Sequence, residues 1–137
     1  MEDLGLDPKL VDKSLYFKKV NDNKKKLYAA LDLGTNSCRM LIARPTGSRF
    51  EIVDAFSKSI RLGIDLERTG ELSQAGITRA LQALHVCAKK LNKFRVKNSR
   101  LVATEACRRS KNGKSFLQKV KIETGLKLEL IKPEEEA

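Results

Sequence analysis

The sequence contains no tryptophan, five phenylalanines and two tyrosines, so aromatic residues make up only 5% of its 137 residues. Stacking of bases on aromatic rings supplies much of the affinity of single-strand nucleic-acid binders, and this scarcity makes nucleic acid an unfavoured partner. Cysteine is also scarce, with Cys38, Cys87 and Cys107 far apart. An odd, dispersed set predicts reduced thiols in a cytoplasmic protein rather than a disulfide framework or a zinc site.

Long apolar runs are missing too. No stretch approaches the roughly 20 apolar residues that a membrane helix needs, and the acidic start at residues 1–8 lacks the apolar core of a secretory signal. Charge, in contrast, is abundant, with 28 Lys and Arg against 17 Asp and Glu, a formal net charge of +11. This balance favours a polyanionic partner, namely nucleic acid, polyphosphate, a nucleotide or an acidic surface.

Residues 27–44 read as an apolar strand, a polar turn and a second apolar strand. In the turn, Gly34 allows the backbone either to approach a ligand closely or to take a positive φ. Asp32 is suited to hold a divalent cation or its water, and Mg²⁺ usually binds one or two carboxylates together with phosphate oxygens. Short side-chain donors and backbone amides that together suit an anion-binding concavity come from Thr35, Asn36 and Ser37.

This turn is neither a Walker A loop, because no Gly-Lys-Ser/Thr follows, nor a dinucleotide fingerprint, because it opens into a strand instead of a helix. The D-x-G-T-N hairpin resembles the first phosphate loop of the actin-like ATPase and sugar-kinase superfamily. An ordinary hairpin with a polar turn is the alternative, since short turns are commonly built from these residues.

The remaining pattern predicts the order β-β-β-α-β-α-β. Strands are expected at residues 27–33, 38–44, 49–56, 99–104 and 127–131, and helices at 73–94 and 114–124, with an irregular connector at 57–72. Ser73 is a suitable N-cap and Gly125 a suitable helix end. The expected inward-facing residues are Phe50, Ile52 and Val53 on the third strand and Ile77, Leu81, Leu84, Ala88 and Leu91 on the first helix. The apolar positions of the second helix are Phe116, Leu117, Val120 and Ile122. The single histidine, His85, is expected at the surface or at the boundary of the core.

This order predicts an α/β domain, a mixed five-stranded sheet with helices packed on it. Ligands of such sheets lie beyond the carboxyl ends of the parallel strands. The turns at residues 32–37, 104–108 and 133–136 all follow strands, so we expect them to converge on one cleft if those strands are parallel neighbours.

Five collinear motifs make a specific resemblance. They are D-L-G-T-N-S at residues 32–37, R-L-G at 61–63, G-x-L-S at 70–73, A-T-x-A-x-R-x-x-x-N at 103–112 and E-E-A at 135–137. Together they resemble the N-terminal domain of the exopolyphosphatase/guanosine pentaphosphate phosphatase family. The resemblance implies a ribonuclease-H-like, actin-type fold, with a 1–26 basic extension followed by a first phosphatase domain at 27–137.

The family resemblance also implies a chemistry, the Mg²⁺-dependent hydrolysis of terminal phosphoanhydride bonds in polyphosphate or pppGpp. Carried over by motif, the phosphate-binding residues are Gly34, Thr35, Asn36, Ser37 and Arg108, with Arg61 adding positive charge. Asp32 would lie beside the metal, and Glu136 would activate or orient the attacking water. Without the motifs, the three glutamates would be read as a solvated helix start stabilised by its dipole.

Two departures from the family pattern stand out. Lys132 and Pro133 replace the residues that usually precede the acidic run. The second phosphate loop and second domain do not occur in these 137 residues, so we expect little or no turnover from this chain alone, and a homodimer through the face that would meet the second half stays open. The alternatives are a non-catalytic polyanion-binding module and a fragment of another actin-like ATPase.

Overall fold

The computed structural model describes residues 26–135, so Glu136 and all of the expected extension except Lys26 lie outside the described residues. The elements are β1 (Tyr28–Leu33), β2 (Ser37–Thr46), β3 (Arg49–Ser59), α2 (Leu66–Thr69), α3 (Gln74–Lys93), β4 (Asn98–Ala103), α4 (Glu105–Arg109), α5 (Gly113–Thr124), β5 (Glu129–Leu130) and the 3-10 turn η2 (Pro133–Glu135). The predicted order is confirmed, with the short helices α2 and α4 added to it. No helix within residues 26–135 is both long and apolar enough to cross a membrane.

The five strands form one mixed sheet in the order β3-β2-β1-β4-β5. β2 runs antiparallel to β1 and to β3, whereas β4 runs parallel to β1 and to β5. A mixed five-stranded sheet was expected, but β5 has only two residues where a strand of five was predicted. The antiparallel half is a meander with short connections, and the parallel half is reached through helices, as right-handed crossovers require.

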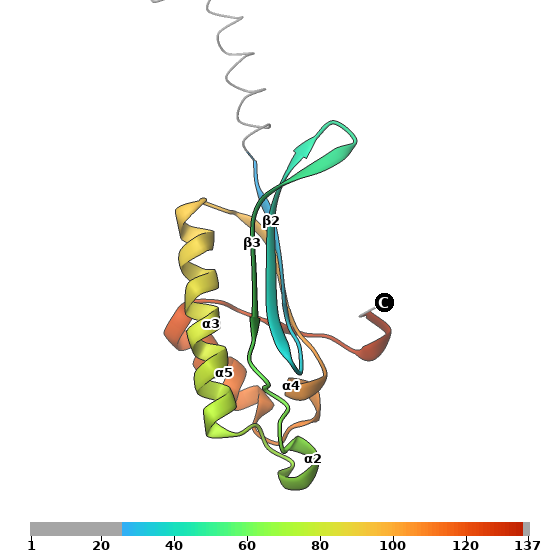
Figure 1. Ribbon diagram of the computed structural model, residues 1–137, viewed down its shortest axis with the longest axis vertical. Coiled ribbons are helices and arrows are strands. Elements are labelled where there is room, and N and C mark those ends of the chain that lie inside the picture. Colours follow the sequence, from blue (N-terminus) through green and yellow to red (C-terminus); the bar gives the residue numbers. More distant parts are fainter. Residues whose placement is uncertain (1–25, 136–137) are drawn as a thin grey trace, which may run out of the picture.

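Helices α3 and α5 both cover the same face of the sheet, and the opposite face is open (Figure 1). On β1, Ala29, Leu31 and Leu33 are buried and alternate with exposed residues, of which Asp32 is one. Because side chains on a strand point to opposite faces in turn, Asp32 lies on the open face. The core between sheet and helices includes Cys38, Met40 and Ile42 of β2, Leu81, Leu84 and Cys87 of α3, and Phe116 and Val120 of α5.

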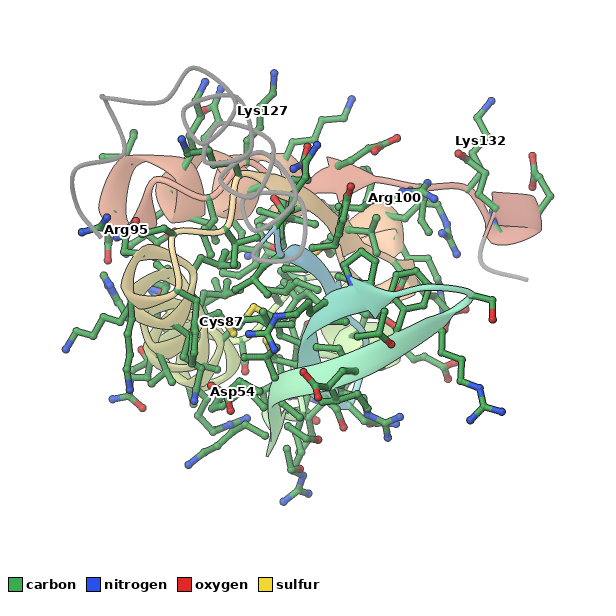
Figure 2. The ribbon with its side chains drawn as sticks, turned by 90° about the horizontal axis from the view of Figure 1, so that it is seen from above. Asp54, Cys87, Arg95, Arg100, Lys127 and Lys132 are labelled. Carbon is green, nitrogen blue, oxygen red and sulfur yellow. The ribbon has the colours of Figure 1, made fainter. Side chains whose placement is uncertain are left out.

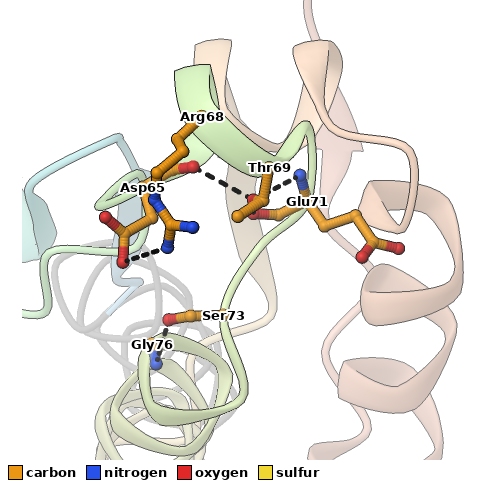
Figure 3. A network of polar contacts seen from close by, with 6 residues as sticks. All are labelled: Asp65, Arg68, Thr69, Glu71, Ser73 and Gly76. Carbon is orange, nitrogen blue, oxygen red and sulfur yellow. Dashed lines mark hydrogen bonds and ion pairs between the residues drawn. The ribbon is translucent and has the colours of Figure 1, made fainter.

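Helix α3 begins where the sequence predicted. The Ser73 hydroxyl accepts a hydrogen bond of 3.0 Å from the Gly76 amide (Figure 3), which satisfies a donor of the first turn. The predicted apolar stripe is buried or half-buried along its whole length. His85 is an exposed residue 3.8 Å from Glu123, in line with the expectation of a surface histidine. Gly125 ends α5 with a φ of 78°.

Two expected core residues are wrong, because Phe50 is 69% exposed and Ile52 62%. Ile122, one of the apolar positions of α5, is 84% exposed. The register between β2 and β3 shifts after Ile42, leaving Val53 as an extra residue. The outer half of this hairpin extends past the helices, so neither of its faces is covered there (Figure 1). Ile122 is two residues from the buried Val120, a spacing that places the two on different sides of a helix.

Candidate active site

The three polar turns meet at one edge of the sheet. β1, β4 and β5 are parallel neighbours, so their carboxyl ends lie together. The Thr104 amide donates a hydrogen bond of 3.1 Å to the Leu33 carbonyl, and the Ile131 amide donates one of 3.1 Å to the Ala103 carbonyl. The predicted convergence of residues 32–37 and 104–108 with the chain after β5 is therefore confirmed for the described part of the last turn.

The loop after β1 is held through its carbonyl groups. The Asn36 carbonyl accepts hydrogen bonds from the amides of Ile60, at 2.8 Å, and Arg61, at 3.0 Å, and the Thr35 carbonyl accepts one of 3.0 Å from the Gly63 amide. The Gly34 amide is used within the loop, donating to the Ser37 carbonyl at 2.9 Å. Within residues 26–135, the amides of Thr35 and Asn36 have no hydrogen-bond partner. A rigid loop with spare amide donors has the chemistry of an anion site.

Glycine is required in this loop and beside it for different physical reasons. A Cβ on Gly63 would lie 2.3 Å from Cγ2 of Thr35, so the R-L-G motif allows the 60–63 segment to pack directly on the loop. Gly34 has no positive φ, and a Cβ there would meet its nearest neighbour, the Ser37 carbonyl oxygen, at an ordinary 3.6 Å. Of the two reasons predicted for Gly34, the fold therefore excludes positive φ, and close approach of a ligand is left.

Asp32 lines a groove of about 370 Å³ on the open face of the sheet. Arg39, directly opposite Asp32 in the β1–β2 register, also lines the groove, as do Thr104 and Glu135. Sequence reasoning missed Arg39. The signal was present, because Arg39 stands two residues after Ser37 on a strand and so points to the same side.

Arg108 connects two of the turns. Its Nη1 donates a hydrogen bond of 2.6 Å to the Ile131 carbonyl, which ties α4 to the segment that follows β5. In that segment the Glu135 carboxylate accepts a hydrogen bond of 3.0 Å from the Lys132 amide, and the Glu135 amide donates to the Lys132 carbonyl at 2.9 Å. Glu135 therefore closes the turn that contains Lys132 and Pro133, while the predicted catalytic Glu136 lies beyond the last described residue.

Arg61 is not brought into the groove of Asp32. It lines a separate depression with Asp65, Ser73 and Arg79, and its φ of 49° is a left-handed conformation. The guanidinium of Arg79, which sequence reasoning did not consider, donates to the Ile60 carbonyl at 2.7 Å and to the Arg61 carbonyl at 3.4 Å. Arg79 thus fixes the backbone that in turn holds the Asp32–Ser37 loop.

Two of the motifs are joined by the Asn112 side chain. Its amide accepts a hydrogen bond of 2.8 Å from the Leu72 amide and donates one of 3.0 Å to the Leu72 carbonyl. Upstream of Leu72, the Thr69 hydroxyl donates to the Asp65 carbonyl at 3.0 Å and accepts from the Glu71 amide at 3.1 Å (Figure 3). The 70–73 and 103–112 motifs therefore build the support of the site.

The cysteines do not offer a nucleophile. All three are buried and free. The pKa of the Cys38 thiol is raised by its hydrogen bond with Cys87 and by burial, and burial raises the pKa of Cys107 to about 12. Because the thiolate is the reactive form, the raised pKa values make Cys38 and Cys107 unreactive at neutral pH. The hydrogen bond with Cys38 lowers the pKa of Cys87, but its side chain is fully buried and out of reach of a substrate.

Oxygen ligands for a divalent cation come from few residues. No group of three or more His, Cys, Asp or Glu side chains capable of holding a metal occurs within residues 26–135. Asp32 lines the groove, and the other carboxylate of the groove, Glu135, is bonded to the Lys132 amide. One or two carboxylates with room for phosphate oxygens fit Mg²⁺, which keeps waters and substrate oxygens as ligands, better than a metal held by protein alone.

A mixed five-stranded sheet in the order β3-β2-β1-β4-β5, with helices packed on it, defines this chain as a domain of the actin-like class. Residues 41–137 match the model of the Ppx/GppA phosphatase family. The chain therefore belongs to the Ppx/GppA family.

The relatives are much longer than this chain. A guanosine-5'-triphosphate,3'-diphosphate pyrophosphatase of Photobacterium profundum is 34% identical over 111 residues, which cover 81% of this chain and 22% of that protein. The Ppx/GppA family member of Aquifex aeolicus superimposes with a TM-score of 0.78 at 36% identity, over 81% of this chain and 36% of the other. An exopolyphosphatase-like protein gives a TM-score of 0.75 at 30% identity, over 81% of this chain and 34% of that one. This chain thus spans about a fifth of the curated relative and about a third of the solved structures.

Proposed function

We propose that this chain supplies the first half of an Mg²⁺-dependent active site that hydrolyses terminal phosphoanhydride bonds of inorganic polyphosphate or pppGpp. The observation that carries the proposal is the meeting of the Asp32–Ser37 loop with the Thr104–Arg108 turn at the carboxyl edge of parallel strands. The names of the relatives support the substrates, since one is a pyrophosphatase of guanosine-5'-triphosphate,3'-diphosphate and another is exopolyphosphatase-like. Free buried thiols support a reducing, cytoplasmic setting.

In this proposal the phosphate is held by the loop and by α4. The amides of Thr35 and Asn36, with the backbone of Gly34 and the hydroxyl of Ser37, cradle the terminal phosphate. Arg108 clamps it with a guanidinium whose fork of donors suits phosphate oxygens. Arg61 adds positive charge from the neighbouring depression without contacting the phosphate.

Asp32 would hold Mg²⁺ in the groove, and the ion would neutralise charge on the phosphates. Phosphoryl transfer needs mainly positioning and charge stabilisation from the protein. Glu136 would orient the attacking water and accept its proton. Glu135 accepts the hydrogen bond from the Lys132 amide and so keeps the turn before residue 136 closed; in this proposal it does not act on the water.

The second half of the site would come from a further domain, because the relatives extend well beyond the matched region. We therefore expect little or no turnover from the 137-residue chain, with or without dimerisation. The test is phosphate release from polyphosphate and from pppGpp with Mg²⁺, by this chain and by a chain of the relatives' length that contains it.

Neighbouring glutamates provide a matched pair of variants for the longer chain. Glu136→Gln should abolish phosphate release, whereas Glu135→Gln should retain most of it, because an amide oxygen can still accept from the Lys132 amide. Equal activity of the two variants would contradict the assignment of Glu136, and Mg²⁺-independent release would contradict the role of Asp32.

A further inference from the structure

A second positively charged region lies far from the candidate active site. The twelve residues from Lys89 to Arg100 include six cationic side chains and no carboxylate. They form the end of α3, the turn after it and the start of β4. Adding the exposed cations at the start of β1 and just before β5, we define the basic edge as Lys26, Lys89, Lys93, Arg95, Lys97 and Lys127.

The basic edge lies at the amino ends of the parallel strands, opposite the phosphate loop. Tyr28 pairs with Asn98 at that end of β1, and Leu33 pairs with Ala103 at the other. The five residue steps from Tyr28 to Leu33, at roughly 3.3 Å each, separate the two ends by about 17 Å. Figure 2 looks down on this edge, with Arg95 at the end of α3 and Lys127 beyond α5.

Most of these cations have no anionic partner. Two cations of the 89–100 segment that we leave out of the basic edge do have partners, since Lys90 is paired with Asp54 at 2.7 Å and Arg100 is 4.0 Å from Glu129. Within residues 26–135, the side chains of Lys89, Arg95, Lys97 and Lys127 form no ion pair. Like charges that lie together without partners repel one another, so binding a polyanion at the basic edge is electrostatically favourable.

The helix dipole explains only part of this edge. Cations in the last turn of a helix are stabilised by its negative end, which accounts for Lys90 and Lys93. That effect falls off within the last turn, and Lys97 and Lys127 lie beyond it. Lys127 instead lines a depression of about 530 Å³ with Arg100. Because Arg100 also lines the groove of Asp32, the basic edge adjoins the face on which the candidate site opens.

The two aromatic rings at this edge each have a lysine over one face. Lys26 lies over the Tyr28 ring at 5.8 Å from its centroid, and Lys93 lies over the Phe94 ring at 5.5 Å. Two rings, each with a lysine over one face, offer little stacking surface for the bases on which single-strand nucleic-acid binders depend. The chemistry of the edge therefore fits a chain of phosphates without bases better than a nucleic acid.

We propose that the basic edge binds a distant part of a long inorganic polyphosphate chain whose terminal phosphate occupies the candidate active site. This inference rests on the proposed function for the terminal site, but the edge itself is a separate surface. It gives the protein a preference for long chains over short ones. Binding there is electrostatic and should weaken steeply with salt, because the lysine and arginine side chains displace the condensed counterions of the polyanion into solution.

The test compares two triple variants of the full 137-residue chain. The edge variant is Arg95→Asn, Lys97→Gln and Lys127→Gln, with asparagine chosen because Arg95 has a φ of 54°. The control variant is Arg49→Gln, Lys114→Gln and Lys119→Gln, which removes the same charge from other exposed positions. Affinities for long-chain polyphosphate and for tripolyphosphate are measured at several salt concentrations, with circular dichroism as a check on folding.

The edge variant should lose about tenfold or more in affinity for long-chain polyphosphate, and its salt slope should fall by about two. Its affinity for tripolyphosphate should stay unchanged, and the control variant should bind both ligands almost normally. Equal losses in both triple variants, or none in either, would overturn the proposal, as would equally tight binding of a single-stranded RNA. An Arg108→Gln variant tests the proposed function separately. If the proposed function is wrong, this variant should still bind tripolyphosphate normally. The comparison of the two triple variants at the basic edge does not depend on that result.

Discussion

Replacing Gly63 by alanine tests whether the 60–63 segment holds the phosphate loop in place. The new Cβ would lie 2.3 Å from Cγ2 of Thr35, whereas carbon atoms in contact are normally about 3.5–4.0 Å apart, so the Thr35 side chain or the two segments must move by more than 1 Å. Overpacking of this kind costs about 1–3 kcal/mol. Alanine recovers about 0.4–1 kcal/mol by restricting the unfolded chain. The net loss in the free energy of unfolding should be about 1–2 kcal/mol.

A double-mutant cycle isolates the contact. Thr35→Ser removes Cγ2, and the next atoms around the new Cβ, Cβ and the carbonyl oxygen of residue 35, are at ordinary distances of 3.6 and 3.7 Å. In the Thr35→Ser background, Gly63→Ala should therefore cost little, giving a coupling energy of about 1–2 kcal/mol between the two positions. Urea unfolding of the four proteins measures it. The same cost in both backgrounds would refute the packing explanation of the R-L-G motif.

Three further changes test other parts of the site and its support. Gly34→Ala should leave the urea midpoint nearly unchanged, because its Cβ fits, yet weaken tripolyphosphate binding measured by calorimetry; a large loss of stability would contradict the ligand-approach explanation. Asn112→Ala should lower the free energy of unfolding by about 1–3 kcal/mol, because both polar groups of Leu72 lose their partner, and a change within error would refute the bridging role. The hydrogen bond from Lys90 lowers the pKa of Asp54, so this carboxylate stabilises the fold above its ordinary pKa and the gain is lost as the pH falls through the lowered value. In Lys90→Met, the melting temperature should fall less steeply as the pH is lowered. An unchanged pH dependence of the melting temperature would contradict this role of the ion pair.

Local patterns were sufficient to predict most of the elements. The period of α3, the Ser73 cap and Gly125 at the end of α5 are local signals, and each was confirmed. The exposure of Phe50 and Ile52 was not predictable, because it depends on the bulge at Ile42 and on how far the hairpin extends past the helices. Alternation alone places a side chain on a face but does not say whether anything covers that face.

In the candidate site, too, some features could be predicted from the sequence and others could not. The D-x-G-T-N-S turn and its convergence with Thr104 followed from motif order and parallel topology. The supporting contacts of Arg79 and Asn112 did not, because a side chain bonded to a distant backbone leaves no periodic signal. Arg61 was assigned to the site by its motif, yet its side chain lines a different depression. The part of the R-L-G motif that contacts the loop is Gly63.

The most direct measurement of the central claim is a titration of the 137-residue chain with tripolyphosphate and Mg²⁺, followed through the backbone amide signals in nuclear magnetic resonance spectra. If the loop after β1 is a phosphate site, the amides of Thr35 and Asn36 should shift most, with smaller changes around Arg108, and Gly34→Ala should reduce these shifts. Unmoved signals for Thr35 and Asn36, with shifts confined to residues 89–100, would contradict the claim and leave the chain as a polyanion-binding surface alone.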